Sequence, residues 1–195
     1  MDKEKYLKEQ REQKENYLRY RLGFLQLIHK PILNMLLISL VALFIGLWIG
    51  KTRLITFLNV PELILPIFRY TLCIISIIIP IIILLWLIKY IGELSARKDE
   101  ADLQQAFTKE ELRNSCPILM DKRKVKGSNV TMREFYSAIP LEIWNTRKNA
   151  IADMMNIHFV EEIQYGGKSD GRRIVIFTAP GRKPTERGNL YDEEL

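Results

Sequence analysis

Two apolar segments joined by a short connection constrain the fold of this chain more than any other feature. Residues 31–50 and 70–88 contain no Asp, Glu, Lys, Arg or His. At about 1.5 Å of rise per residue, helices of this length match the ~30 Å hydrocarbon core of a bilayer. Backbone groups in lipid must be satisfied within their own segment, which favours helices. We predict a transmembrane hairpin over residues 31–91, with spans at about 31–50 and 70–90; two buried helices of a soluble protein are the alternative.

The charge of the chain is concentrated next to these segments. The formal net charge is +6, yet the residues from Gly92 onward hold 17 basic and 17 acidic side chains. Residues 1–30 hold eight Lys and Arg against five acids, and residues 51–91 hold four against one. This distribution predicts anionic membrane lipids as the partner of the basic charge. It argues against a nucleic-acid interpretation of the high pI, although direct contact with DNA stays an open question.

Residues 1–30 are predicted to form a basic juxtamembrane tail that ends in a helix. Leu18, Leu22 and Leu25 recur at helical spacing. Nearby cations that can reach lipid phosphates are Arg19, Arg21 and Lys30. The pattern indicates a helix that lies on the membrane surface and leads into the first span.

The first span contains a pair of glycines that could let helices pack closely. Gly46 and Gly50 have the GxxxG spacing found at helix–helix contacts in membranes. They are candidate helix-packing residues, and they favour a homo-oligomer; chance occurrence in so apolar a segment is the alternative.

The distribution of Lys and Arg also predicts the topology. Eight precede the first span, whereas the connecting loop holds Lys51, Arg53 and Arg69. After the second span, Lys89, Arg97 and Lys98 only equal the count of the loop, so the N-terminal count decides. It predicts that both termini lie in the cytoplasm of a multi-pass cell-membrane protein. Since neither span contains an ionisable residue, a transporter or channel is not expected. Pro61 and Pro66 exclude a continuous helix through the connection, residues 51–69.

A small cytoplasmic α+β domain is predicted over residues 92–184, followed by a polar tail, residues 185–195. Thr108 and Glu111 form a capping-box pattern for a short helix, residues 109–114. A strand is predicted to begin at Ile118. Pro140 precedes a helix with an apolar stripe, Trp144, Ile151 and Met155. Residues 158–165 and 172–178 are predicted as two strands, which completes an αββ unit. The fold class is therefore an α+β membrane protein.

A basic run before a loop is the candidate binding site of this domain. Its cations are Lys122, Arg123, Lys124 and Lys126, and Gly127-Ser128-Asn129 follows them. They could contact phosphate or lipid, and a solvated charge run is the alternative interpretation.

No pattern in the sequence predicts catalysis. Gly167-Lys168-Ser169 resembles the end of a phosphate-binding loop, but Glu162 stands where that loop requires glycine, and strands are predicted on both sides. We interpret it as a hairpin turn. Cys73, Cys116, His29 and His158 are too isolated for a metal site. We expect no catalytic residue, no cofactor and no metal, so the chain is not predicted to be an enzyme.

Residues 138–182 carry a resemblance to a known family. The segments Ile139–Trp144, Ile151–Asn156 and Arg173–Thr178 are similar to a module of FtsK/SpoIIIE-type DNA translocases, more narrowly of Gram-positive conjugation coupling proteins. In that family a membrane hairpin precedes a small αββ-containing domain and an ATPase. The resemblance implies a membrane anchor and assembly module in conjugation, DNA transfer or cell division, with an ATPase motor and DNA-transfer proteins as partners.

The Walker loops of that family's motor are absent from this sequence. The resemblance therefore implies an N-terminal fragment or a short relative that works through partners, and it transfers no catalytic residue. The alternative is a stand-alone two-span structural or adaptor subunit of another membrane complex without a DNA role. A membrane-tethered regulatory protein is a further alternative.

Overall fold

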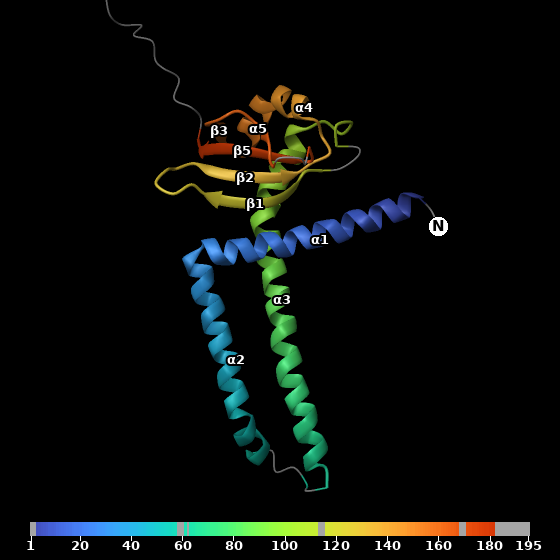
Figure 1. The fold of residues 1–195 in the computed structure, drawn as a ribbon, viewed down its shortest axis with the longest axis vertical. Coiled ribbons are helices and arrows are strands. Elements are labelled where there is room, and N and C mark those ends of the chain that lie inside the picture. The colour runs from blue at the N-terminus through green and yellow to red at the C-terminus, as the bar shows by residue number, and fades with distance from the viewer. Residues whose placement is uncertain (1–2, 58–60, 62, 113–115, 168–170, 182–195) are drawn as a thin grey trace, which may run out of the picture. The chain divides into compact units, whose positions relative to one another are not determined.

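The computed structural model describes residues 3–57, 61, 63–112, 116–167 and 171–181 (Figure 1). The chain divides into two compact units, residues 1–97 and 98–195. Helix α3 begins in the first unit and ends in the second. The predicted boundary between hairpin and cytoplasmic domain at residue 92 therefore falls within a continuous helix.

The first unit consists of helices. These are α1 (Lys3–His29), α2 (Pro31–Phe57) and the greater part of α3 (Leu65–Ala106). Lys30 alone separates α1 from α2, and Pro31 begins α2, where a missing N–H costs nothing. Helix α1 is continuous from Lys3, so the predicted tail and the predicted surface helix form one element.

Helices α2 and α3 are longer than the predicted spans. Helix α2 continues past Gly50 to Phe57, and α3 begins at Leu65 and runs for 42 residues. The non-helical connection predicted over residues 51–69 is therefore too long. Pro66 does not prevent the start of α3 because a proline is tolerated in the first turn of a helix.

The apolar parts of α2 and α3 lie on the outside of the fold. Both helices are long and apolar enough to cross a membrane, and none of the most apolar 18-residue window of either helix is buried inside the chain. A helix in the core of a soluble protein would bury most of this surface. The most apolar windows of α2 and α3 are therefore not part of the core of this chain.

Helix α1 crosses α3 at two glycines, with direct contact between the backbones (Figure 1). A Cβ atom added to Gly23 would lie 1.9 Å from the carbonyl oxygen of Ile88. A Cβ atom added to Gly92 would lie 2.1 Å from the carbonyl oxygen of Arg19. Only glycine fits at either position without a shift of the helices.

The second unit contains an antiparallel sheet. Its strands are β1 (Ile118–Lys124), β2 (Thr131–Tyr136), β3 (Ile157–Phe159), β4 (Gln164–Tyr165) and β5 (Arg173–Pro180), with the order β1-β2-β5-β3 and β4 also paired to β5. The predicted start of a strand at Ile118 and the predicted strand at residues 172–178 are confirmed. The predicted strand 158–165 is instead two short strands, β3 and β4. Strand β2 was not predicted, and it pairs with β5 on the side that a two-stranded hairpin would leave open.

Two short helices follow β2, where the sequence predicts one. Helix α4 (Leu141–Thr146) and helix α5 (Lys148–Met155) are separated at Arg147. The predicted apolar stripe is confirmed, because Trp144, Ile151 and Met155 are buried. The indole of Trp144 contacts the ring of Phe135 on β2, with ring centroids 5.6 Å apart, and the ring of Phe107, at 5.1 Å. The predicted αββ unit is thus part of a larger core.

The predicted capping box forms its hydrogen bonds without the predicted helix. The N–H of Thr108 donates to Glu111 Oε2 at 2.7 Å, and the N–H of Glu111 donates to Thr108 Oγ1 at 3.4 Å. Residues 109–112 form turns, and residues 113–115 lie outside the described part of the chain. The two hydrogen bonds close a turn between α3 and the sheet.

Candidate functional site

The β1–β2 hairpin holds the predicted basic segment. The N–H of Val125 donates to the carbonyl of Val130 at 2.9 Å, which continues the ladder of the two strands. Gly127 has φ 75°, a conformation that glycine adopts without strain. Ser128 Oγ donates to the carbonyl of Val125 and accepts from the N–H of Val130, both at 3.3 Å. The loop signal in the sequence thus corresponds to a tight turn.

The four predicted cations do not form one patch, because three of them belong to β1. Strand β1 includes Lys122, Arg123 and Lys124, so alternate side chains point to opposite faces of the sheet. The ammonium of Lys122 lies 2.8 Å from Asp99 Oδ2, and Arg123 Nε lies 3.8 Å from Asp121 Oδ2. Two of the four cations that are predicted to contact phosphate or lipid, Lys122 and Arg123, therefore lie next to acidic side chains.

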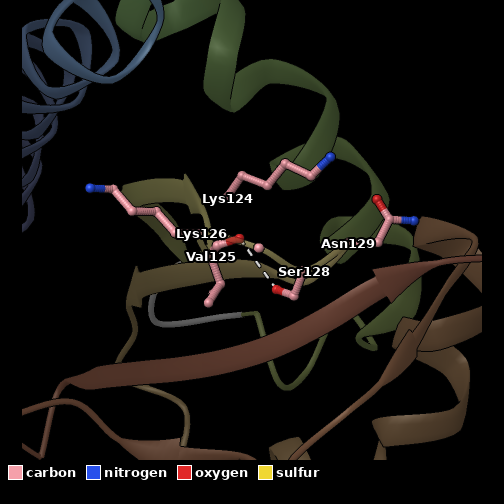
Figure 2. A pocket seen from close by; sticks show the side chains of 6 residues that line it. Lys124, Val125, Lys126, Ser128 and Asn129 are labelled. Carbon is pink, nitrogen blue, oxygen red and sulfur yellow. Dashed lines mark hydrogen bonds between the residues drawn. The ribbon is translucent and has the colours of Figure 1, made fainter.

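The other two cations lie at the turn. Lys124 and Lys126 are exposed, and they line an open pocket together with Val125, Gly127, Ser128 and Asn129. Figure 2 shows the two ammonium groups pointing away from each other. In this arrangement the two ammonium groups do not converge on one point. Contact with phosphate or lipid by these lysines stays a prediction.

A buried ionic cluster joins the end of α3 to the sheet. Oδ2 of Asp99 accepts from Arg133 Nε at 3.0 Å and lies within reach of Lys122. Arg133 also donates to the hydroxyl of Thr178, which in turn donates to the carbonyl of Thr131 at 3.2 Å. Strand pairing opposes Lys122 to Arg133, which brings both cations to one carboxylate. The groups are mutually satisfied, as a structural cluster requires.

Sequence reasoning missed this cluster. Arg133 lies in β2, the strand that was not predicted, and Asp99 lies in α3, 34 positions earlier in the sequence. The available signal was Arg133 itself, a cation between the apolar Met132 and the aromatic Phe135. A charged residue within such a segment indicates a buried partner.

Glu111 has a perturbed titration. Burial favours its protonated form, but the N–H and hydroxyl of Thr108 and the guanidinium of Arg147, 3.1 Å away, outweigh burial and lower the pKa of Glu111. The carboxylate joins the turn after α3 to the break between α4 and α5. Its role in this geometry is structural.

The candidate packing glycines of α2 make no close contact within the chain. A Cβ atom added to Gly46 or Gly50 would meet no atom within 4 Å. A close helix approach within the chain occurs at Gly23 and Gly92, a pair that lies 69 positions apart in the sequence and shows no local motif. The prediction that Gly46 and Gly50 pack between copies stays a prediction.

The phosphate-loop-like segment is only partly described. Lys168 and Ser169 lie outside the described residues. Gly167 has φ 94°, and the N–H of Gly166 donates to the carbonyl of Arg173 at 2.7 Å. Strands β4 and β5 flank the segment on both sides, as the hairpin-turn interpretation predicts. Among the described residues, no group of three His, Cys, Asp or Glu side chains could hold a metal ion.

No protein-family model matches the chain, and no curated protein matches it. The chain is similar to the structure of the pCW3 conjugation coupling protein TcpA, monomer form with ATPgS, at 25% sequence identity and a TM-score of 0.37. The similarity covers 43% of this chain and 24% of that chain. This TM-score does not establish a shared fold, and the comparison gives no support for a role in cell division.

Proposed function

We propose that the chain is a membrane anchor and assembly module of an FtsK-like DNA translocase or conjugative DNA-transfer complex. The observation that carries the anchoring part is the unburied apolar surface of α2 and α3. A surface of this size is costly in water and favourable in lipid. Helix α3, at 42 residues, is about twice as long as the hydrocarbon core is thick. Its apolar half would span the bilayer, and its polar half would lead into the sheet domain.

The DNA-transfer part of the proposal rests on the resemblance of residues 138–182 to FtsK/SpoIIIE-type translocases. The similarity to the TcpA structure is consistent with it and adds no independent weight at its TM-score. In the proposed arrangement both termini are cytoplasmic, and the sheet domain serves protein–protein assembly. The chain works as a homo-oligomer beside a separate or attached ATPase motor, and Gly46 and Gly50 are free to form the contact between copies.

Anchoring and topology are tested by labelling single-cysteine variants in intact cells with an impermeant reagent. With Cys73 and Cys116 replaced by serine, cysteines at positions 10, 60 and 190 are compared. Only position 60 should react before the cells are opened. Labelling at 10 or 190 but not at 60 would reverse the orientation. Release of the chain from membranes by alkaline carbonate would refute the anchor itself.

The assembly role is tested by deleting the chain from its host and measuring DNA transfer between cells. Transfer should fall to background and return with the wild-type chain. It should not return with a variant that lacks residues 31–91. Normal transfer after the deletion would refute the DNA-transfer role and favour a subunit of another complex.

The proposal also includes the absence of ATP hydrolysis by this chain alone. Purified chain in detergent should show no ATPase activity above background. Activity that is abolished by Lys168→Ala would contradict this point and revive the phosphate-loop interpretation.

A further inference from the structure

Helix α1 has two faces of different character. One face is buried in the fold and includes Leu18, Leu22 and Gln26. Two of the leucines predicted to dip into lipid therefore do not face outward, and Arg19, predicted to reach phosphate, is buried and bonded to Glu15 at 3.1 Å. The other face carries a stripe of large apolar and aromatic side chains at spacings of three, four and four residues: Tyr17, Tyr20, Phe24 and Ile28.

This stripe is exposed although its side chains are apolar or aromatic. Tyr17 is 67% exposed, and Phe24 is 56% exposed. The stripe ends at Ile28, and the exposed apolar surface of α2 begins at Ile32. The stripe on α1 therefore ends four residues before the surface of α2 that is proposed to face lipid.

The glycine crossing fixes the position of α1 along α3. Gly23 contacts the backbone of Ile88, and Gly92 contacts the backbone of Arg19. Ile88 is the last residue of the apolar run of α3, and Lys89 follows it. Helix α1 therefore crosses α3 at the point where its sequence changes from apolar to charged.

A pair of aromatic residues lies on α3 close to the crossing with α1. The rings of Trp86 and Tyr90 stack with centroids 5.3 Å apart, and the two side chains are 62% and 46% exposed. These residues flank Ile88, the contact point of Gly23. Trp and Tyr are enriched at the headgroup level of membranes because one end of each ring is apolar and the other is polar.

Resting on the proposed anchoring function, we propose that α1 lies in the headgroup region of the cytoplasmic leaflet. The face formed by Tyr17, Tyr20, Phe24 and Ile28 dips into anionic lipid at the depth of Trp86 and Tyr90. Arg21 follows Tyr20 in the sequence, and Lys30 lies two positions after Ile28. Both side chains are long enough to reach lipid phosphates. Because the crossing at Gly23 and Gly92 fixes α3 to α1, the position of α1 in the headgroup region then sets how far α3 enters the bilayer.

The test measures membrane depth by site-directed spin labelling of the full chain. Single cysteines are introduced on a background of Cys73→Ser and Cys116→Ser, and the chain is reconstituted in vesicles of phosphatidylcholine with phosphatidylglycerol. Tyr17→Cys and Phe24→Cys report on the proposed lipid face. Glu12→Cys and Asn16→Cys report on exposed positions of α1 outside the stripe and serve as controls. Leu43→Cys in α2 reports on the anchor. All five sites are exposed, so the labels disturb no core packing.

The expected result is a depth of about 5–10 Å below the headgroup boundary for labels at 17 and 24. Labels at 12 and 16 should be accessible to a water-soluble nickel complex, and the label at 43 should be deep. A deep label at 43 with labels at 17 and 24 as water-accessible as the controls would overturn this inference and leave the anchor intact. A water-accessible label at 43 would refute the anchor itself. Spin–spin broadening at 24 with protection from both oxygen and nickel would show that a second copy covers the face, which also overturns the inference.

Discussion

The α2–α3 hairpin and the sheet domain distribute their side chains in opposite ways. In the hairpin, isoleucines such as Ile78 and Ile82 face outward. In the domain, charged residues such as Asp99 and Arg133 are buried and apolar residues fill the core around them. The same hydrophobic effect explains both distributions if the surroundings differ: lipid around the hairpin, as proposed, and water around the domain. Removing a buried side chain should therefore destabilise the domain, whereas removing an outward-facing side chain of the hairpin should not.

The largest expected effect comes from a matched pair of tryptophans. Trp144 is fully buried in the domain, and Trp86 is exposed on α3. Trp144→Ala should lower the free energy of unfolding of the domain by about 3–5 kcal/mol, because it leaves a cavity beside Phe107 and Phe135. Trp86→Ala should leave the stability of the domain unchanged. Hydrogen exchange of the β2 and β5 amides measures both. Similar losses for the two variants would break the comparison.

A comparable effect is expected from the buried ionic cluster. Asp99→Ala leaves Arg133 without its carboxylate in a buried position, which should cost about 3–5 kcal/mol. Glu110→Ala removes an exposed acid near the end of the same helix and should change stability little. Denaturant unfolding of the domain, monitored by hydrogen exchange of the Thr178 amide, distinguishes the two variants. An Asp99→Ala variant as stable as wild type would mean that the cluster contributes nothing to the fold.

A smaller effect is expected at the helix crossing. Gly92→Ala forces a Cβ atom into the backbone of α1 and should cost about 1–3 kcal/mol of packing energy. Gly46→Ala meets no atom and should favour the helix by up to about 1 kcal/mol. Hydrogen exchange in the middle of α1 should become faster for the first variant only. Equal exchange in both would show that the crossing does not hold α1.

The smallest effect concerns pH. The pKa of Glu111 is lowered in the folded state, so its charged form stabilises the fold. This contribution is present above the ordinary carboxyl pKa of 4.5 and is lost as the pH falls through the lower, folded-state value. Glu111→Gln should therefore be less stable than wild type at neutral pH, and the difference should vanish in acid. A difference that persists at low pH would assign the effect to shape rather than to charge.

The sequence by itself determined the elements whose hydrophobic pattern shows which residues are polar, apolar or buried along that same element. The absence of charge over residues 31–50 and 70–88 predicts two long helices, and the spacing of Trp144, Ile151 and Met155 predicts a buried helical face. The alternation along β5 likewise predicts a strand, because Ile174, Ile176 and Thr178 all point to one face of the sheet. In each case the preference is local and repeats along the element.

Only the tertiary structure decided the features that join distant residues. Strand β2 contains Arg133 and Glu134, two charged residues whose burial in a central strand depends on their partners, Asp99 and Arg173. The motif of Gly46 and Gly50 is visible in the sequence, but the intrachain backbone contact of Gly23 and Gly92 has no local motif and is seen only in the fold. The four cations near residue 124 look equivalent in sequence, yet the fold places Lys122 2.8 Å from Asp99 of α3 and leaves Lys126 exposed. A charge or a glycine acquires its role from the partner that the fold brings to it, and that partner is not its neighbour in the chain.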